Sequence, residues 1–313
     1  MRIVSLLPST TEIAFALGLG DQVVAVTHEC DYPPEARERP MITSSALDHH
    51  HATSAEIDAA VRGQVRDGIS IYSLDTVMLE RLQPDLVLTQ ALCDVCAVSF
   101  GVVEQAVAQV SAAPRILSLE PTSLEGIFGS ILAVGNATGR RAQAIELVAQ
   151  LRARVERVRE RAARAASRPR VACLEWFDPP FGPGHWFPEL VELAGGRAGL
   201  GAPGEPSRRL TWDDVVAFAP EVLVLAPCGF DLERASSEAL AVLPRRPGWS
   251  ALPAVRAGRV FAVDANSYFS RPGPRVVDSL ELLARLIHPD LFAGWGPPEG
   301  ACRLEKAVAQ PGS

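Results

Sequence analysis

The sequence has no apolar run long enough to cross a membrane, no excess of positive charge and no familiar catalytic motif. A membrane-spanning helix needs about 18 consecutive apolar residues, and no run in the 313-residue chain reaches that length. The formal net charge is −7, which argues against nucleic acid as a partner. A nucleophile elbow, a phosphate-binding glycine loop, a dinucleotide fingerprint and an HExxH motif are all absent. We therefore expect a binding protein and not an enzyme.

Cysteine is scarce, and no segment resembling a secretory leader precedes the first expected strand. Six cysteines in 313 residues are too few for a disulfide scaffold, so we expect reduced thiols. A leader would place a charged segment, an apolar segment and a small-residue cleavage site ahead of Ile3. If Met1 is the native start, we expect a cytoplasmic protein. If a leader has been removed, the expected place is the periplasm or the cell surface.

Hydrophobic residues make up 48% of the chain and charged residues 21%, which is typical of a folded globular protein. The length suits two domains of roughly 100 to 150 residues each. Strand and helix patterns alternate along both halves, which predicts α/β lobes with mostly parallel sheets covered by helices. The tracts LDTVMLERLQPDLVLTQ and LTWDDVVAFAPEVLVLAPC share an acidic helix, a proline, an acid and an apolar strand. We interpret them as corresponding elements of two similar lobes.

One long helix is predicted between the lobes, over residues 137–166. Its apolar stripe recurs at spacings of three and four and consists of Ile145, Val148, Leu151, Val155 and Val158. About thirty residues at about 1.5 Å each would make a rod of about 45 Å. The pattern fits a plain surface helix or a stiff strut between lobes, and its place midway along the chain favours the strut. The expected organisation is a first lobe over 1–136, a linking helix over 137–167, a second lobe over 168–292 and a poorly ordered tail over 293–313.

The chain opens on a strand, a Pro-Ser-Thr-Thr turn and an amphipathic helix. Ser9 or Thr10 is placed to cap this helix, and Glu12 lies in its expected first turn, near the positive end of the helix dipole. A strand that delivers a helix N-terminus to the edge of a sheet is a common way to build a ligand cleft. We therefore place Ser9 and Thr10 among the ligand-binding candidates.

Unusual loops follow four apolar strands, and parallel sheets bind ligands at the carboxyl ends of their strands. The richest loop, EWFDPPFGPGHW over 175–186, holds aromatic residues between prolines, which predicts a rigid apolar wall with a few polar groups. A hydrophobic plug over the sheet edge is the alternative interpretation. The loop NSYFSRPGPR faces the same end of the second lobe. These loops supply the other ligand-binding candidates: Tyr32, Gln90, Trp176, Phe177, Phe181, Trp186, Tyr268 and Arg271.

Cys93 and Cys96 form a CxxC motif, whose thiolates can chelate a soft metal or exchange disulfides. Further ligands would come from neighbouring loops, which hold Cys30, His28 and His185. A bound Zn, Cu or Fe ion is therefore one interpretation, and a metal-dependent enzyme belongs with it. Small buried residues that pack a tight loop are a comparable interpretation, because free cysteine is often buried.

The segment RIVSLLPSTTEIAFALGLGDQVVAVTHECDYP, the element LERLQPDLVLTQ and the helical strut resemble the cobalamin- and iron-chelate-binding solute-binding proteins of ABC transporters. The resemblance covers roughly residues 1–290, and QALCDVCAVS, EWFDPPFGPGHW and YFSRPGPR are similar to a corrinoid-type subgroup. It implies two Rossmann-like lobes tied by one long helix, with cobalamin, another corrinoid or a related metal chelate in the cleft between them.

The resemblance also implies a partner. In this family an acid on each lobe docks on arginines of a membrane permease, and Glu80 and Asp213 match those positions, with Asp214 as a substitute. We expect a monomer that binds its ligand without chemistry, as a component of an ABC transporter or as a cytoplasmic relative of one.

Overall fold

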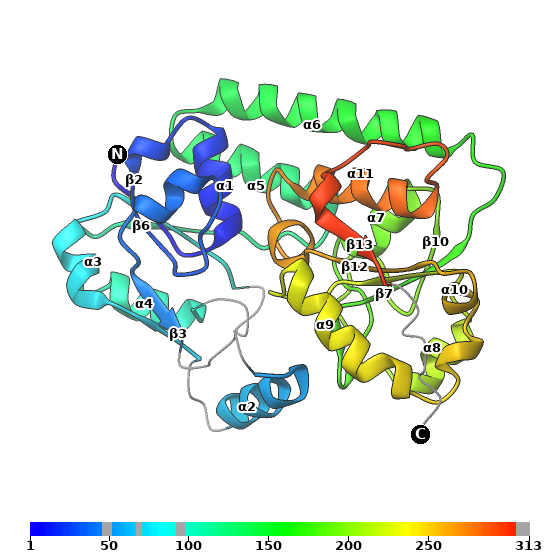
Figure 1. The fold of residues 1–313 in the computed structure, drawn as a ribbon. Helices are drawn as coiled ribbons and strands as arrows, with labels where there is room; N and C mark the ends of the chain where they lie inside the picture. Colours follow the sequence, from blue (N-terminus) through cyan, green and yellow to red (C-terminus); the bar gives the residue numbers. More distant parts are fainter. Residues whose placement is uncertain (46–51, 67–70, 92–97, 305–313) are drawn as a thin grey trace. The chain divides into compact units, whose positions relative to one another are not determined.

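The computed structural model describes residues 1–45, 52–66, 71–91 and 98–304, and it divides into two compact units (Figure 1). The first unit comprises Met1–Pro121, Glu125–Leu151 and Pro272–Pro274. The second comprises Thr122–Leu124, Arg152–Arg271 and Arg275–Ser313. Each unit holds a mostly parallel sheet with helices, so the predicted α/β class with two lobes is confirmed.

A four-stranded parallel sheet forms the centre of the first unit, in the order β2-β1-β5-β6. Its strands are β1 (Ile3–Ser5), β2 (Val23–Val26), β5 (Leu86–Thr89) and β6 (Arg115–Ser118). A separate antiparallel pair consists of β3 (Thr43–Ser45) and β4 (Tyr72–Leu74). The helices are α1 (Pro8–Ala16), α2 (Ser54–Arg66), α3 (Thr76–Leu82), α4 (Phe100–Val107), most of α5 (Leu124–Ala137) and the short η1 (Gly20–Gln22) and η2 (Pro34–Glu38).

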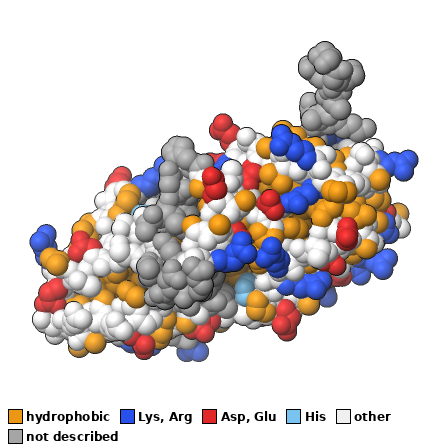
Figure 2. All heavy atoms as spheres, turned by 90° about the horizontal axis from the view of Figure 1, so that it is seen from below, with side chains coloured by type: hydrophobic (Ala, Val, Ile, Leu, Met, Phe, Trp, Pro, Cys, Tyr) orange, Lys and Arg blue, Asp and Glu red, His pale blue; other side chains and the backbone are white. Residues whose placement is uncertain are grey.

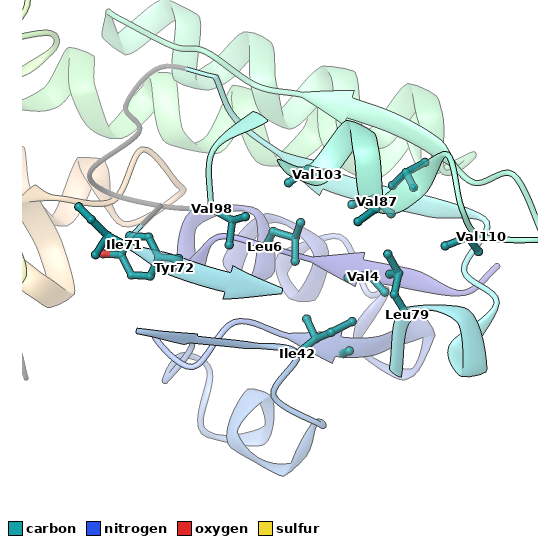
Figure 3. Packing of buried hydrophobic residues seen from close by; sticks show 13 residues of the cluster. Val4, Leu6, Ile42, Ile71, Tyr72, Leu79, Val87, Val98, Val103 and Val110 are labelled. Carbon is teal, nitrogen blue, oxygen red and sulfur yellow. The ribbon is translucent and has the colours of Figure 1, made fainter. Parts of the chain in front are cut away.

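One apolar cluster joins the parallel sheet to the small pair and to two helices (Figure 3). Val4 and Leu6 come from β1 and its end, while Ile42 and Tyr72 come from the small pair and the residue before it. Leu79 of α3 is fully buried in the same cluster. Burying this apolar face against the helices is the main force that holds the layer together.

The second unit repeats the plan with one more strand, in the order β10-β7-β11-β12-β13. Its strands are β7 (Arg170–Leu174), β10 (Arg197–Gly199), β11 (Val222–Leu225), β12 (Val260–Val263) and β13 (Ala301–Arg303). A two-stranded hairpin, β8 (Trp176–Phe177) and β9 (Pro180–Phe181), follows β7. The helices are α7 (Phe187–Leu193), α8 (Trp212–Phe218), α9 (Leu232–Val242), α10 (Pro253–Arg256), α11 (Val276–Ile287), the π-helix η5 (Ala265–Phe269) and the short η3 (Leu243–Arg245), η4 (Trp249–Ala251) and η6 (Pro298–Gly300).

The two sequence tracts that we interpret as corresponding elements form α3–β5 and α8–β11. Each helix ends on a residue with positive φ, 42° at Gln83 and 48° at Ala219, and a proline follows. The next acid, Asp85 or Glu221, accepts a hydrogen bond from a backbone N–H where the first sheet strand of the unit begins. These bonds, from Arg2 at 2.7 Å and from Arg170 at 3.0 Å, place β1 and β7 equivalently. The expected similarity of the two lobes is therefore confirmed.

The long helix is shorter than predicted. Helix α6 (Arg141–Ala162) has 22 residues and is about 33 Å long. It starts later than predicted because the chain leaves the helical conformation between α5 and α6. Gly139 has a φ of +73° there, and the Arg140 N–H donates back to Gly135 O at 2.7 Å. Residues of α6 up to Leu151 belong to the first unit and those from Arg152 to the second.

Two other expectations need correction. Helix α1 begins at Pro8 and has no side-chain cap, since proline is well suited to a first helical position, and Ser9 and Thr10 therefore lie inside it. The segment 301–304 is no loose tail: β13 pairs antiparallel with β12, and its three residues are too few to show an alternating pattern. None of the helices within the described residues is both long and apolar enough to cross a bilayer.

The packing of α3 predicts a large difference between two of its apolar residues. Leu79→Ala removes a fully buried side chain and should lower the free energy of unfolding by about 2 to 5 kcal/mol, measured by urea denaturation. Val77→Ala is the matched control on the same helix, because that side chain is 68% exposed. Its change should stay within about 0.5 kcal/mol. Equal effects of the two substitutions would contradict this packing.

Candidate functional site

The candidate residues of the first unit lie where β1, β2 and β5 end. Ser9 and Thr10 are buried in the first turn of α1, and Gln90 is buried directly after β5. Tyr32, in the loop after β2, is 44% exposed. Of these four side chains, Tyr32 is therefore the one that this unit presents openly to a ligand.

A buried hydroxyl network fixes the start of α1. The Ser5 and Thr10 hydroxyls lie 2.6 Å apart, and the Thr11 hydroxyl donates to Ser5 at 2.8 Å. The Cys30 sulfur is 3.0 Å from the Thr11 hydroxyl. Because buried polar groups need partners, these side chains stabilise the strand-to-helix turn. Thr10 and Cys30 hold the edge of the sheet in shape, and neither side chain reaches solvent.

His28 is held from both sides in the same region. Its Nδ1 lies 2.8 Å from the Thr43 hydroxyl, and its Nε2 lies 3.3 Å from a Glu29 carboxylate oxygen. The imidazole is also tilted against the Tyr72 ring, with centroids 5.7 Å apart. Both ring nitrogens thus have polar neighbours within the first unit.

In the second unit the aromatic loop is a hairpin followed by a tightly packed turn. Trp176 pairs with Phe181 across β8 and β9, and the Trp176 ring meets Phe230 edge-on at 5.3 Å. Asp178, in the hairpin turn, forms a 2.9 Å ion pair with Arg246. Trp176 and Phe181 are partly exposed, as a ligand-facing wall requires.

Residues 182–185 pack backbone to backbone against residues 200–210. Gly182 N–H donates to Arg208 O at 2.9 Å, and His185 N–H donates to Glu205 O at 2.7 Å. A Cβ on Gly184 would lie 2.2 Å from Ser207 N, so only glycine fits there. The turn is consequently held in one conformation by close approach of two chain segments.

Glu175 lies behind this turn, directly after β7. Its carboxylate accepts hydrogen bonds from the Ser207 hydroxyl and, at 3.3 Å, from Gly184 N–H. Within the described residues it has no cationic partner. Burial disfavours the ionised form and raises the pKa of Glu175 to about 7, although both hydrogen bonds act in the opposite direction.

His185 and Trp186 close the loop. His185 has a φ of +52°, a strained value for a non-glycine residue, and its ring stacks on Trp186 with centroids 5.9 Å apart. Burial lowers the pKa of His185, which keeps the imidazole neutral at neutral pH. His185 Nδ1 and Trp186 Nε1 are buried, and neither has a hydrogen-bond partner among the described residues. Two uncharged polar atoms at one end of an aromatic wall are suited to orient a ligand.

Three other candidates of this unit lie in its interior. Phe177 is fully buried in the core cluster that contains Leu223 and Trp212. Tyr268 is buried in η5, and its hydroxyl donates to Glu299 at 3.3 Å. Arg271 is buried and donates to Asn266 at 3.2 Å. Their contacts position the loops, so a ligand would meet Trp176 and Phe181 first.

A sequence profile of the family described as "Periplasmic binding protein" matches residues 3–267. The chain belongs to this family. It is 26% identical over 298 residues to the uncharacterized ABC transporter substrate-binding lipoprotein YvrC of Bacillus subtilis. The aligned residues cover 93% of this chain and 81% of that protein. It is 28% identical over 232 residues to a vitamin B12-binding protein of Yersinia pestis, covering 72% and 69% respectively. The periplasmic heme-binding protein RhuT of Roseiflexus sp. RS-1 has a similar structure, with a TM-score of 0.69, 25% identity and coverage of 93% and 98%.

Membership of the periplasmic binding protein family confirms the resemblance to solute-binding proteins of ABC transporters. The metal-site hypothesis gains no such support. Within the described residues no three His, Cys, Asp or Glu side chains gather as metal ligands do. Cys93 and Cys96 lie outside those residues, so a thiolate site there stays a prediction.

Sequence reasoning missed two polar residues at this edge of the second sheet. Glu175 is the first residue of the aromatic loop, and an acid directly after a buried strand is a usable signal. Ser207 carries no local signal, since its partner Glu175 lies 32 residues earlier in the chain. The Glu175–Ser207 pair therefore emerges only from the fold.

The raised pKa of Glu175 predicts how this periplasmic binding protein responds to pH. The folded pKa of about 7 exceeds the ordinary value near 4.5, so the folded state binds the proton more tightly than the unfolded chain. The stability that proton binding at Glu175 gives the folded state is fully present below about pH 4.5, and it is lost as the pH rises through 7. Relative to Glu175→Gln, the wild type should lose about 1 to 3 kcal/mol between pH 5 and pH 8.5 in urea denaturation. Parallel curves for the two proteins would show that Glu175 does not titrate this way.

Proposed function

We propose that the protein binds a corrinoid such as cobalamin, or a related metal chelate, as the solute-binding component of an ABC transporter. The observation that carries the proposal is the chemistry of residues 175–186. The rings that this loop exposes are Trp176 and Phe181, and the same loop holds a buried tryptophan, a neutral imidazole and a carboxyl group with a pKa near 7. Such a surface suits a large apolar chelate with uncharged polar groups at its edge.

The vitamin B12-binding relative supports the corrinoid, and the heme-binding structural neighbour makes heme the competing ligand. The wall favours the corrinoid. A corrinoid carries amides along its edge, which accept and donate hydrogen bonds without charge, whereas heme carries carboxylates. A carboxylate near Glu175 would meet a second acid in a buried setting, which is unfavourable. In the first unit, Tyr32 offers a second exposed aromatic ring, whereas Ser9, Thr10 and Gln90 are buried.

Hydroxocobalamin should raise the melting temperature of the protein and quench its tryptophan fluorescence at saturating concentration. Binding stabilises the folded state in proportion to the logarithm of ligand concentration over Kd, so the shift should grow with concentration. Trp176→Phe should weaken binding, because it removes the larger ring from the wall, while Trp249→Phe on η4 is the matched control and should bind normally. Hemin in place of the corrinoid tests the competing ligand. A response to hemin alone would overturn the corrinoid proposal, and no response to either would overturn chelate binding.

We propose that a membrane permease docks on two exposed helices of this protein, one in each unit. Glu80 of α3 has its carboxylate fixed by Ser111, which donates from its backbone N–H at 2.9 Å and its hydroxyl at 2.6 Å. Those bonds lower the pKa of Glu80 and keep it ionised. On α8, Asp214 is engaged in a capping box with Thr211, so the exposed Asp213 is the acid that this helix offers.

The internal repeat supports equivalent roles for the two helices. The N-caps Asp75 and Thr211 correspond, so Val77 matches Asp213 and Glu80 matches Val216. Each helix therefore presents one acid and one exposed valine a single turn apart, in exchanged order. On the face shown in Figure 2, charges of both signs are interspersed with hydrophobic side chains. A partner that meets both helices would need a cation and an apolar contact for each.

Charge reversal should separate docking from ligand binding. Glu80→Arg and Asp213→Arg should each reduce uptake of labelled cobalamin by cells that carry the cognate permease at least tenfold, because each repels a cationic docking site. Glu146→Arg, on the exposed surface of α6, is the control and should leave uptake unchanged. Hydroxocobalamin affinity should be the same in all three variants. Full uptake by both docking variants would contradict these docking residues.

The same proposal assigns a place in the cell. The relatives are described as a lipoprotein and a periplasmic protein, which favours the periplasm or the cell surface over the cytoplasm.

A further inference from the structure

Glu175 joins several chain segments near the aromatic loop. Its backbone N–H donates to Phe181 O at 3.0 Å, and its carbonyl accepts from Cys228 N–H at 3.1 Å. Its side chain reaches Gly184 and Ser207. One residue thus connects β7 with the hairpin, the turn 182–185, the segment 200–210 and the loop after β11.

We propose that Glu175 is a positioning residue for ligand binding: it ties the turn 182–185 to the end of β7 and so sets where His185 and Trp186 stand. The proposal deepens the proposed function and rests on it for the ligand. The geometry leaves the turn little freedom. Gly184 has no room for a Cβ against Ser207, and a Cβ on Gly182 would lie 2.2 Å from Leu200 O. His185 has a positive φ, and its backbone bonds with Gly204 and Glu205 stabilise that conformation.

Several of the charged groups around Glu175 have partners of their own, so the protonation state of Glu175 is the quantity that changes with pH. The titratable or charged side chains on the surrounding elements are Cys173, Asp178, His185, Glu205, Arg208, Arg209, Cys228 and Asp231. Asp178 pairs with Arg246, Arg208 donates to Leu200 O, and the Asp231 carboxylate caps α9. Burial makes the Cys173 thiol hard to ionise and keeps His185 neutral. Within the described residues no ion pair fixes the charge of Glu175.

The difference in the pKa of Glu175 between the closed and the opened turn determines how pH shifts the balance between them. The closed turn buries the carboxyl group and raises its pKa, whereas an opened turn would hydrate it and restore an ordinary pKa. The closed turn therefore binds the proton more tightly, so acid favours the closed turn and deprotonation favours its opening. A neutral Glu175 still accepts from Gly184 N–H and can donate to the Ser207 hydroxyl. The wall should consequently be best ordered below pH 7.

Hydrogen exchange tests the turn without any ligand. The Gly184 amide bonds to Glu175, whereas the Arg140 amide bonds to Gly135 O outside the turn and is the internal control. In the wild type, protection of Gly184 relative to Arg140 should fall about tenfold between pH 6 and pH 8.5. Glu175→Gln keeps a neutral group of the same shape, and its ratio should stay high and independent of pH. Glu175→Ala should show a low ratio at both pH values. A ratio that is flat in the wild type, or that changes in parallel in Glu175→Gln, overturns the proposal.

Ligand binding gives the second readout, with hydroxocobalamin as the probe. The wild type should bind several-fold more tightly at pH 6 than at pH 8.5 relative to Glu175→Gln, and this ratio cancels any titration of the ligand itself. Equal pH dependence of binding in the two proteins overturns the link between Glu175 and affinity. If neither protein binds the probe while the exchange ratio still titrates in the wild type, the corrinoid proposal fails and the role of Glu175 in ordering the turn stands.

Discussion

Parallel pairing of β7 with β10 and β11 is the constraint on which the candidate site of the second unit depends. The three strands are in register, with Ala172 opposite both Gly199 and Leu223, so their carboxyl ends reach one edge together. The loops that begin at Glu175, Leu200 and Ala226 must then meet there. This register makes contacts between residues far apart in sequence possible, such as that of Glu175 with Ser207. The aromatic wall is a consequence of where the strands stop.

The two halves of the chain share what builds the sheet and differ in what lines its edge. Asp85 and Glu221 make the same bond to the first strand of their units, and Gln83 and Ala219 end equivalent helices with the same backbone turn. At the carboxyl edges the resemblance stops. The first unit has a network of small hydroxyl groups around Ser5, and the second has aromatic rings around Glu175.

Local patterns in the sequence were enough for most of the fold. Thr211 with Asp214 is a capping signal within four residues, and α8 begins directly after Thr211. Failures came where distant contacts decide. Ala301–Arg303 becomes a strand only because β12 offers an edge, and Tyr268 turns inward because Glu299 and the core receive it. The loop 175–186 could be predicted as a candidate wall, but which of its rings face outward depends on packing against residues 200–230.

Within the described residues Glu175 has no cationic partner, and its ionised form is costly beside an aromatic wall. Arg246 reaches the same hairpin, yet it pairs with Asp178 and also donates to Phe177 O at 3.3 Å. A cation on Glu175 would hold the carboxylate ionised and put a buried ion pair behind the ligand surface, at a large desolvation cost. With Ser207 and Gly184 as hydrogen-bond donors, the Glu175 carboxyl group has a pKa of about 7 and therefore gains or loses its proton near neutral pH. The wall can therefore be uncharged when the turn is closed, which is the condition that an apolar chelate with amide edges requires.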